Sequence, residues 1–266
     1  MSAALRARIA AAGLDWIVPR WDGPASVDAL FTTRHGGASE GACATMDVGT
    51  AHPDAAALAG AVGINRGRLR AFLPSDPIWL SQVHGRDVVR VDAANAPALR
   101  AAPPTADAAV TRTPGIVLTV RTADCLPVLL ADRAGQVLAV AHAGWRGLAA
   151  GVLEAALAAM AVPPRDVHAW LGPAIGKRMF EVGDDVLAAF GGRAAPAAAC
   201  FTPSRDGKWR ADLPGLARAR LADAGVTHVA GGHWCTHSES ARFFSYRRER
   251  DSGRMALVAW LRTDAR

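Results

Sequence analysis

Short, almost unbroken apolar runs alternate along the chain with glycine- and proline-marked turns, and Ala/Leu-rich stretches of helical spacing separate several of them. Continuous apolar runs of about four to eight residues are typical of strands buried on both faces. We therefore expect strands at 16–18, 29–33, 78–80, 88–91, 116–120, 128–131, 137–140, 167–171, 227–230 and 255–261. Helices are expected at 1–14, 54–72, 147–160, 182–190 and 213–224, and loops at 92–106 and 191–208.

The order of these elements mixes strands with helices and shows neither an internal repeat nor a linker long enough to separate two domains. The simplest architecture is one α+β domain over residues 1–266, with mixed β-sheets flanked by helices. Within it, we expect the runs 78–80 and 88–91 to pair around His84, and two further strands to flank a turn at Asp124 and Cys125.

Composition is that of an ordinary globular protein, with 51% hydrophobic and 20% charged residues. No apolar stretch reaches the roughly 18 residues of a membrane-spanning helix, and the basic N-terminus lacks the apolar region of a signal peptide. The four cysteines form no CxxC pair, as expected for reduced thiols. These features indicate a cytoplasmic protein with no membrane partner.

The net charge of +6 does not by itself indicate nucleic-acid binding, because the arginines are mostly scattered through an Ala-rich chain. The stretch from Arg242 to Arg250 is an exception, since four arginines surround Phe243, Phe244 and Tyr246. Arginines beside aromatic rings bind single-stranded nucleic acid, a phosphate or a purine ring. We expect no nucleic-acid partner, and a non-enzymatic nucleotide- or RNA-binding module remains an alternative.

Three segments carry side chains suited to a metal ion. Ser-Gln-Val-His-Gly, Thr-Ala-Asp-Cys-Leu-Pro and Ala-His-Ala-Gly-Trp-Arg-Gly place His84, Cys125 and His142 where an apolar run meets a glycine or proline turn. Two imidazoles and one thiolate suit Zn²⁺, and three protein ligands leave its fourth position open for chemistry. A Cys–His pair without a metal is the alternative. Three other histidines are expected to be ordinary hydrogen-bonded side chains, namely His52, His168 and His228.

The same segments occur, in order, among a longer series of blocks that resembles the YfiH family, whose members carry the name laccase-domain or multicopper polyphenol oxidase. The blocks are TTRHGG (32–37), SQVHG (81–85), TADCLP (122–127), AHAGWRG (141–147), GPAIG (172–176), FEVG (180–183), CT (235–236) and FFSYRR (243–248).

This resemblance implies a YfiH-like layered α/β sandwich with one Zn²⁺ held by His84, Cys125 and His142. It also implies phosphorolysis of purine nucleosides (adenosine, inosine, guanosine and methylthioadenosine) and hydrolytic deamination of adenosine. The partners would be a purine nucleoside and phosphate, and the protein a monomer or weak homodimer. Eight histidines without a His-X-His pair are too few for several copper centres, so copper is expected only adventitiously.

The two reactions make different demands on side chains. Deamination needs a proton donor for the leaving amine, and Asp124 is the nearest candidate in sequence to Cys125. Phosphate suits arginine, and the candidates are Arg34, Arg146 and Arg247.

Other residues support the site in this reading. His35 is expected to protonate the purine or hold the ribose, and Gln82 to orient the metal site or the base. A metal-bound histidine normally donates its second N–H to a carboxylate or carbonyl, here from Asp107 or Asp124. The chain departs from the family pattern at Asp47, where an amide is usual, and at His237, where an aromatic ring is common.

Two other enzyme classes remain as alternatives. In a metal-free hydrolase or amidase, including one that edits cell-wall precursors, Cys125 would be the nucleophile and His84 or His142 its base. A copper-dependent polyphenol oxidase is the other.

Overall fold

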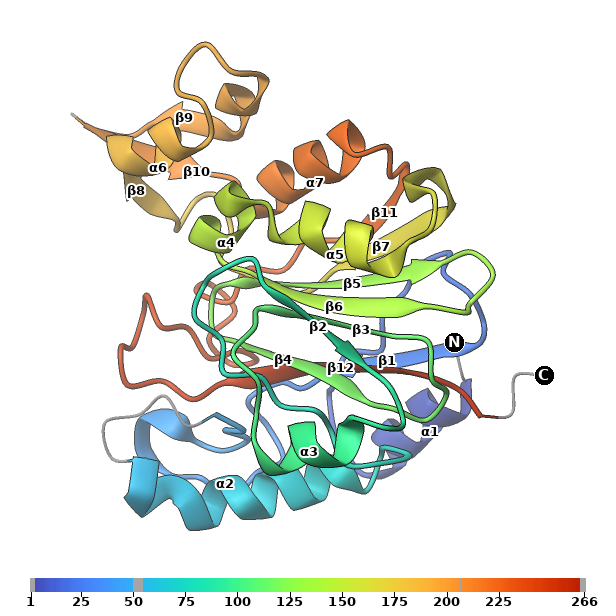
Figure 1. Cartoon of the computed structure of the whole chain (residues 1–266). Coiled ribbons are helices and arrows are strands. Elements are labelled where there is room, and N and C mark those ends of the chain that lie inside the picture. Colours follow the sequence, from blue (N-terminus) through green and yellow to red (C-terminus); the bar gives the residue numbers. More distant parts are fainter. Residues whose placement is uncertain (1–2, 50–54, 206, 264–266) are drawn as a thin grey trace.

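The protein is described by a computed structural model that covers residues 3–49, 55–205 and 207–263. Its elements form four layers in the order helix, sheet, sheet and helix, so that two β-sheets pack on each other between two layers of helices (Figure 1). The expected class, a mixed α/β fold with several sheets flanked by helices, is confirmed. No helix in the described part of the chain is long and apolar enough to cross a membrane.

The larger sheet has six strands in the order β11-β7-β5-β6-β3-β2. Its strands run parallel at the two edges, where β11 pairs with β7 and β2 with β3, and antiparallel between them. The strands are β2 (Val88–Val91), β3 (Ala108–Thr111), β5 (Leu126–Asp132), β6 (Leu138–Ala143), β7 (Val167–Leu171) and β11 (His228–Gly231).

A second sheet of three antiparallel strands, in the order β1-β12-β4, packs beneath the first. It comprises β1 (Val27–Phe31), β4 (Leu118–Thr122) and β12 (Met255–Leu261). A third small sheet, β8-β10-β9, lies with α6 at one end of the upper helical layer (Figure 1). It contains β8 (Glu181–Gly183), β9 (Phe201–Pro203) and β10 (Lys208–Ala211), and it adjoins α6 (Asp184–Ala189).

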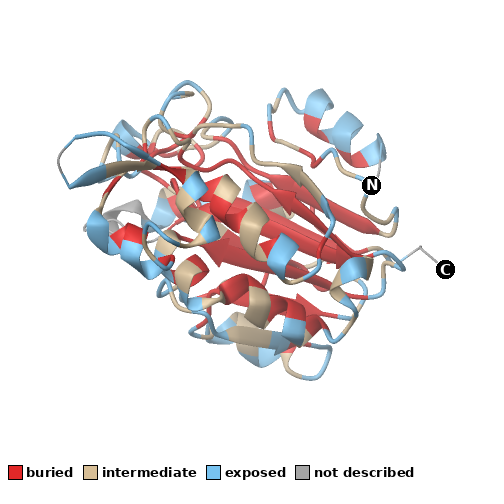
Figure 2. Ribbon diagram, turned by 90° about the horizontal axis from the view of Figure 1, so that it is seen from above, coloured by how far each residue is buried: buried red, intermediate tan, exposed pale blue. Residues whose placement is uncertain are grey.

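Helices close both outer faces of the sandwich. The upper layer contains α4 (Trp145–Ala150), α5 (Val152–Met160) and α7 (Leu213–Asp223), and the lower side contains α1 (Ala3–Ala11), α2 (Ala55–Arg70) and α3 (Ala96–Ala101). In Figure 2 the central strands of the two packed sheets are buried, whereas the helices expose their outer faces and the small third sheet is partly exposed.

The layers explain why the strands are apolar almost without interruption. Along β5, Val128 and Leu130 pack toward the upper helices, whereas Leu129 faces the space between the sheets. In β12, Leu257 faces the other sheet and Val258 faces the lower helices. Because a strand in this position alternates its side chains between two buried faces, successive residues are apolar instead of alternating with polar ones.

Several expected elements are wrong in extent or pairing. The runs 16–18 and 78–80 form only isolated bridges, and β2 pairs with β3 rather than with 78–80. The strands β4 and β5, on either side of Cys125, belong to different sheets. The single helix expected over 147–160 is two, because Gly151 adopts a left-handed φ of 93° between α4 and α5.

The expected loops also contain regular structure. The helix α3 begins within 92–106 with a proline in its first turn, where the missing N–H has no helical partner to lose. The strand β3, missed in the sequence, is rich in alanine, which has little strand preference of its own. The segments 191–208 and 182–190 similarly contain β9 and part of β8.

The core position Leu129 offers a test of this packing. Leu129 is fully buried between the two sheets, so Leu129→Ala is expected to cost about 2–5 kcal/mol of the free energy of unfolding. Ile64→Ala, on the exposed side of α2, is the control and is expected to be nearly neutral. Chemical denaturation measures both, and equal losses in the two variants would contradict the layered core.

Candidate metal centre

The first candidate ligand, His84, lies in a tight loop that a single carboxylate organises. His84 itself has a left-handed φ of 60°. The backbone N–H groups of Val83, His84 and Gly85 all donate to the carboxylate of Asp107, at 3.1, 2.9 and 2.7 Å. Such a nest of amides holds an anion and fixes the loop around it. Asp107 therefore determines where the His84 imidazole points.

The same carboxylate supports the second histidine. His142 lies near the end of β6, and its Nδ1 is 2.8 Å from Oδ1 of Asp107. The backbone N–H of His142 also donates to the carbonyl of Asp107 at 2.7 Å. This contact orients the ring so that Nε2 is the nitrogen left for a ligand. Of the two carboxylates considered in the sequence, Asp107 is thus the one that partners a histidine.

Cys125 lies at the crossover between the two sheets, after β4 and directly before β5. The preceding residue, Asp124, has a φ of 89°, and its carboxylate accepts from Thr236 Oγ1, Ser245 Oγ and the backbone N–H of Arg247. These bonds join the crossover to the C-terminal segment. Asp124 does not line the cavity described below, so its placement does not support the expected role of proton donor.

The three candidate ligands converge. One nitrogen of each histidine and the Cys125 sulfur lie within 4.8 Å of one another, and His84 Nε2 is 3.7 Å from Cys125 Sγ. A tetrahedral Zn²⁺ with ordinary bond lengths separates a sulfur and a nitrogen ligand by about 3.6 Å. The donor set therefore fits zinc in chemistry, and the separation between His84 and Cys125 is close to that of two ligands on one ion. It is the one such group of histidine, cysteine and acidic side chains found among the described residues.

Glycines in the third block allow this convergence. A Cβ atom at Gly144 would lie 2.9 Å from both Cys125 Sγ and His84 Cδ2. A Cβ atom at Gly147 would lie 2.7 Å from the carbonyl oxygen of Gly85. Both distances are shorter than carbon atoms tolerate, so the start of α4 approaches the ligands only because these residues lack side chains.

The electrostatics favour the ligating form of the cysteine. Burial raises the pKa of the Cys125 thiol, but the neighbouring His142 and His84 outweigh burial and bring that pKa down to about 6. Burial lowers the pKa of His142, whereas the Cys125 sulfur and Asp107 raise it, to about 9. The thiolate that binds a metal is therefore stabilised by its surroundings.

A cavity of about 730 Å³ opens onto the three ligands. Of the substrate-binding residues expected from the sequence, Gln82 and Arg146 line it. Apart from the three ligands, the other polar and aromatic side chains of its wall were not expected from the sequence. The lining residues are Ser81, Gln82, Val83, His84, Arg121, Thr122, Ala123, Cys125, His142, Arg146, Tyr246 and Arg254.

Two of these residues, Tyr246 and Arg121, stand at positions that could have been recognised in the sequence. Tyr246 belongs to the FFSYRR block, from which Arg247 was chosen instead, and is 45% exposed. Arg121 is a charged residue at the end of an otherwise apolar run, which is a sign of a strand that ends at a functional site.

Gln82 is fixed by the strand beside it. Its Nε2 donates to the carbonyl of Arg121 at 2.9 Å, and its Oε1 accepts the backbone N–H of Arg121 at 2.8 Å. The side-chain amide therefore joins the His84 loop to β4. This supports a role in orienting the metal site and leaves the amide without a direct role in holding the base.

Arg34 and His35, the two loop residues expected to contact the substrate, make other contacts. The Arg34 guanidinium donates to the carbonyls of Ala44 and Ser240 and lies over the Phe244 ring. His35 is exposed and lies 3.2 Å from the carboxylate of Asp15. Neither residue lines the cavity with the metal ligands.

Arg247 lies beside the cavity in a separate pocket of about 350 Å³, which it lines together with Arg146. Its Nη1 donates to the carbonyl of Glu181, and its guanidinium lies over Phe180. Of the three expected phosphate ligands, Arg146 is thus the one that faces the metal cavity.

The two residues that depart from the family pattern, Asp47 and His237, do not line the cavity. Asp47 is 3% exposed, and its Oδ1 accepts from the backbone N–H groups of Gly49 and Arg254. It does not line the metal cavity and instead supports Arg254, which does. His237 accepts a bond from Arg248 through its carbonyl oxygen, and its ring is not part of the cavity wall.

The arginine-rich stretch near the C-terminus is largely tied to the fold. Phe243 and Phe244 are fully buried, so they cannot stack on bases. Arg248 donates to the carbonyls of Thr236, His237 and Phe243.

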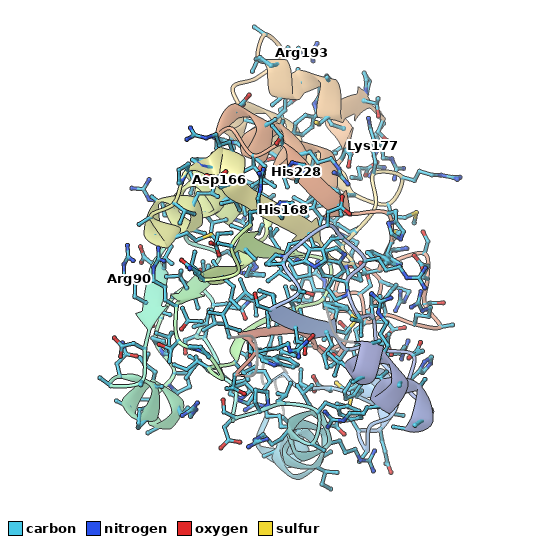
Figure 3. The ribbon with its side chains drawn as sticks, turned by 90° about the vertical axis from the view of Figure 1, so that its right-hand side faces the viewer. Arg90, Asp166, His168, Lys177, Arg193 and His228 are labelled. Carbon is cyan, nitrogen blue, oxygen red and sulfur yellow. The ribbon has the colours of Figure 1, made fainter. Side chains whose placement is uncertain are left out.

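A second pair of histidines, labelled in Figure 3, lies on β7 and β11 at one edge of the large sheet. His168 and His228 are paired across β7 and β11, and their rings stack with centroids 4.5 Å apart and an interplanar angle of 16°. Nδ1 of His168 is buried without a hydrogen-bond partner among the described residues, contrary to the expectation for that residue. Stacked rings do not converge on one ion, so this pair is not a second metal centre. His52, for which a hydrogen-bonded role was also expected, lies outside the described residues.

The chain is similar in sequence and in structure to known proteins of one family. A family model described as multi-copper polyphenol oxidoreductase laccase matches residues 28–262. Proteins named purine nucleoside phosphorylase from Pseudomonas aeruginosa and, as YfiH, from Escherichia coli are each 48% identical, over 92% of this chain and 98% of theirs. A Neisseria meningitidis protein of known structure is 44% identical, with a TM-score of 0.84 over 93% of this chain and 99% of its own. The chain belongs to the YfiH family of laccase-domain proteins.

Proposed function

We propose that this protein is a zinc-dependent purine nucleoside phosphorylase that also deaminates adenosine. The observation that carries the proposal is the convergence of His84, Cys125 and His142 at the base of an open cavity of about 730 Å³. That volume suits a nucleoside. The names of the relatives that are 48% identical over nearly their whole length support the substrate class.

The three convergent side chains would hold the ion, and Asp107 and Gln82 would keep them in place. A zinc ion bound there supplies Lewis-acid chemistry. The loop at His84 is held by Asp107 and Gln82, and the crossover at Cys125 is held by one strand of each sheet, so the site is set before a substrate enters.

In phosphorolysis, a phosphate oxygen bonds to C1′ of the ribose while the bond from C1′ to N9 breaks. The electron pair of that bond leaves with the purine, which takes up a proton, and the products are ribose 1-phosphate and the free base. The cavity has suitable groups, because Tyr246 offers an exposed aromatic face for a purine and the three arginines of the wall offer positive charge for phosphate.

In deamination, a water oxygen bonds to C6 of adenine and the bond from C6 to the exocyclic nitrogen breaks, which releases ammonia and leaves inosine. Among the described residues that line the cavity, none carries a carboxylate. This second activity therefore needs its own assay, separate from phosphorolysis.

A metal-free hydrolase is the second candidate, and one observation favours it. Cys125, His142 and Asp107 form a chain in which Asp107 orients the imidazole through Nδ1 at 2.8 Å and the cysteine thiolate is stabilised by His142. This is the arrangement of nucleophile, base and orienting carboxylate used in covalent catalysis. Removal of metal distinguishes it from the zinc enzyme.

An oxidase with several coppers has little support. The described residues contain one group of convergent histidine and cysteine ligands, and no methionine is among those that line its cavity. The four cysteines are free in the described structure, as is usual in a reducing compartment. We therefore propose that the protein is cytoplasmic. We also propose that it is a monomer or a weak homodimer.

Metal content tests the ligand set. Purified protein is expected to contain about one zinc per chain, and Cys125→Ser is expected to lose it because the thiolate is the charged ligand. Cys200→Ser, a half-buried cysteine elsewhere, is the matched control and should retain the metal. Elemental analysis measures both. Full zinc content in Cys125→Ser would contradict the assignment.

Asp107 offers a second test. Asp107→Asn replaces an acceptor oxygen by an amide donor that faces backbone N–H groups, so zinc affinity is expected to fall about 10- to 100-fold. Asp223→Asn, on the exposed side of α7, should bind zinc like the wild type. Competition with a chelator measures the affinities, and equal affinities would show that Asp107 does not orient the ligands.

Incubation of the zinc-loaded protein with adenosine tests the reaction. Adenine and ribose 1-phosphate are expected only when phosphate is present, because phosphate is a substrate. Inosine is expected with or without it, because water is then the reactant. Chromatography measures all three products. Full activity after chelation, or an acyl group trapped on Cys125, would favour the metal-free hydrolase.

A further inference from the structure

The metal cavity is cationic before any ion is bound. Three of its twelve lining residues, Arg121, Arg146 and Arg254, are arginines, and none of these twelve described residues carries a carboxylate. Excess positive charge in a concave wall attracts anions. The cavity is therefore built to accept a negatively charged group in addition to a neutral nucleoside.

Strand pairing brings two of these arginines together. In the antiparallel pair of β4 and β12, Arg121 lies opposite Ala256 and Thr122 opposite Met255. Arg254, which immediately precedes β12, is therefore the diagonal neighbour of Arg121 on the same face of the sheet. Diagonal neighbours are about 7–8 Å apart, within reach of one another for long side chains. Two guanidinium groups at this separation can hold one tetrahedral anion between them.

Arg121 is held in place from two sides. The Gln82 amide clamps its backbone, and its Nη2 donates to the carbonyl of Leu80 at 2.7 Å. The guanidinium also lies over the Trp79 ring, 5.9 Å from its centroid. An arginine fixed in this way loses little freedom when it binds a ligand.

Arg254 is held from behind by Asp47, which accepts its backbone N–H at 2.7 Å. Its Nη1 donates to the carbonyls of Ser252 and Gly253, and its guanidinium lies over the Tyr246 ring at 5.7 Å. Its Nε and Nη2 have no hydrogen-bond partner among the described residues. These are the two donors that bind an oxyanion side-on.

Two other arginines lie close to Arg121. The charges of Arg66 and Arg254 act on the Arg121 guanidinium by repulsion, and the carboxylate of Asp47 acts on it by attraction. Burial, together with the charges of Arg66 and Arg254, lowers the pKa of Arg121 to about 10. A dianion at this position would relieve the repulsion.

We infer that Arg121 and Arg254 form the phosphate subsite of the cavity. This inference rests on the proposed function, since it names the residues that bind the inorganic phosphate of phosphorolysis. Both arginines reach the metal cavity, whereas Arg34 and Arg247 are tied to carbonyl groups outside it. Gln82 and Asp47 then become positioning residues, each holding the backbone of one phosphate-binding arginine.

The test uses full-length, zinc-loaded protein with the variants Arg254→Gln and Arg121→Lys. The KM for inorganic phosphate is expected to rise about tenfold or more in each, because a charge-assisted hydrogen bond is lost, while the KM for inosine stays near the wild-type value. Arg90→Gln is the matched control: it removes the same charge from an exposed side chain that projects from β2 (Figure 3). It should leave both constants unchanged.

A binding measurement without nucleoside separates this inference from the proposed function. Inorganic phosphate is expected to raise the thermal midpoint of the wild type and of Arg90→Gln, and to raise that of Arg254→Gln much less. If phosphate protects the wild type in this way but no phosphorolysis occurs, the subsite stands and the proposed function fails.

Two results would overturn the inference. One is phosphorolysis by the wild type with an unchanged phosphate KM in both variants. The other is equal protection by phosphate in the wild type and Arg254→Gln. Circular dichroism checks that each variant is folded. If Arg121→Lys is not, Arg254→Gln alone decides, because its side chain lies at the partly exposed cavity wall.

Discussion

A single buried carboxylate organises the metal centre. Asp107 has no exposed surface, and a charge in that position is tolerated only when hydrogen bonds replace the water it has lost. Three consecutive N–H groups of the His84 loop and the imidazole of His142 supply those bonds. Because the carboxylate needs all of these donors, it fixes the left-handed turn at His84 and the orientation of His142 together. Neither ligand can move without leaving Asp107 unsatisfied.

The location of the site follows from the way the chain passes between the sheets. Cys125 lies where the chain leaves the three-stranded sheet and enters the six-stranded one. The larger sheet supplies His142, and the smaller one supplies Arg121 and the strand that Arg254 precedes. One cavity therefore receives metal ligands and cationic side chains from different layers. The crossover is anchored at both ends, and Asp124 ties it to the C-terminal segment, so these groups keep their relative positions.

The family description and the chemistry of this chain point in different directions. A laccase with several coppers needs more than one group of converging ligands, whereas the described residues supply one, with two imidazoles and a thiolate. The arginines in the wall give the cavity a preference for anions that an oxidase of neutral phenols does not require. The structure is thus better suited to a reaction in which an anion and a nucleoside meet beside one metal ion, in line with the names of the similar phosphorylases.

The sequence by itself predicted the apolar strands, the candidate ligand residues and the glycine or proline turns beside them, because each depends on local composition and spacing. It did not determine which sheet each strand joins: β4 and β5 are adjacent in the chain but lie in different sheets, and pairing depends on contacts distant in sequence. Only the tertiary structure selected Asp107 over Asp124 as the partner of His142, and Arg121 and Arg254 over Arg34 as cavity residues. In the sequence, one carboxylate cannot be told from another, nor one arginine from another. The role of each is decided by the donors, acceptors and charges that folding brings beside it.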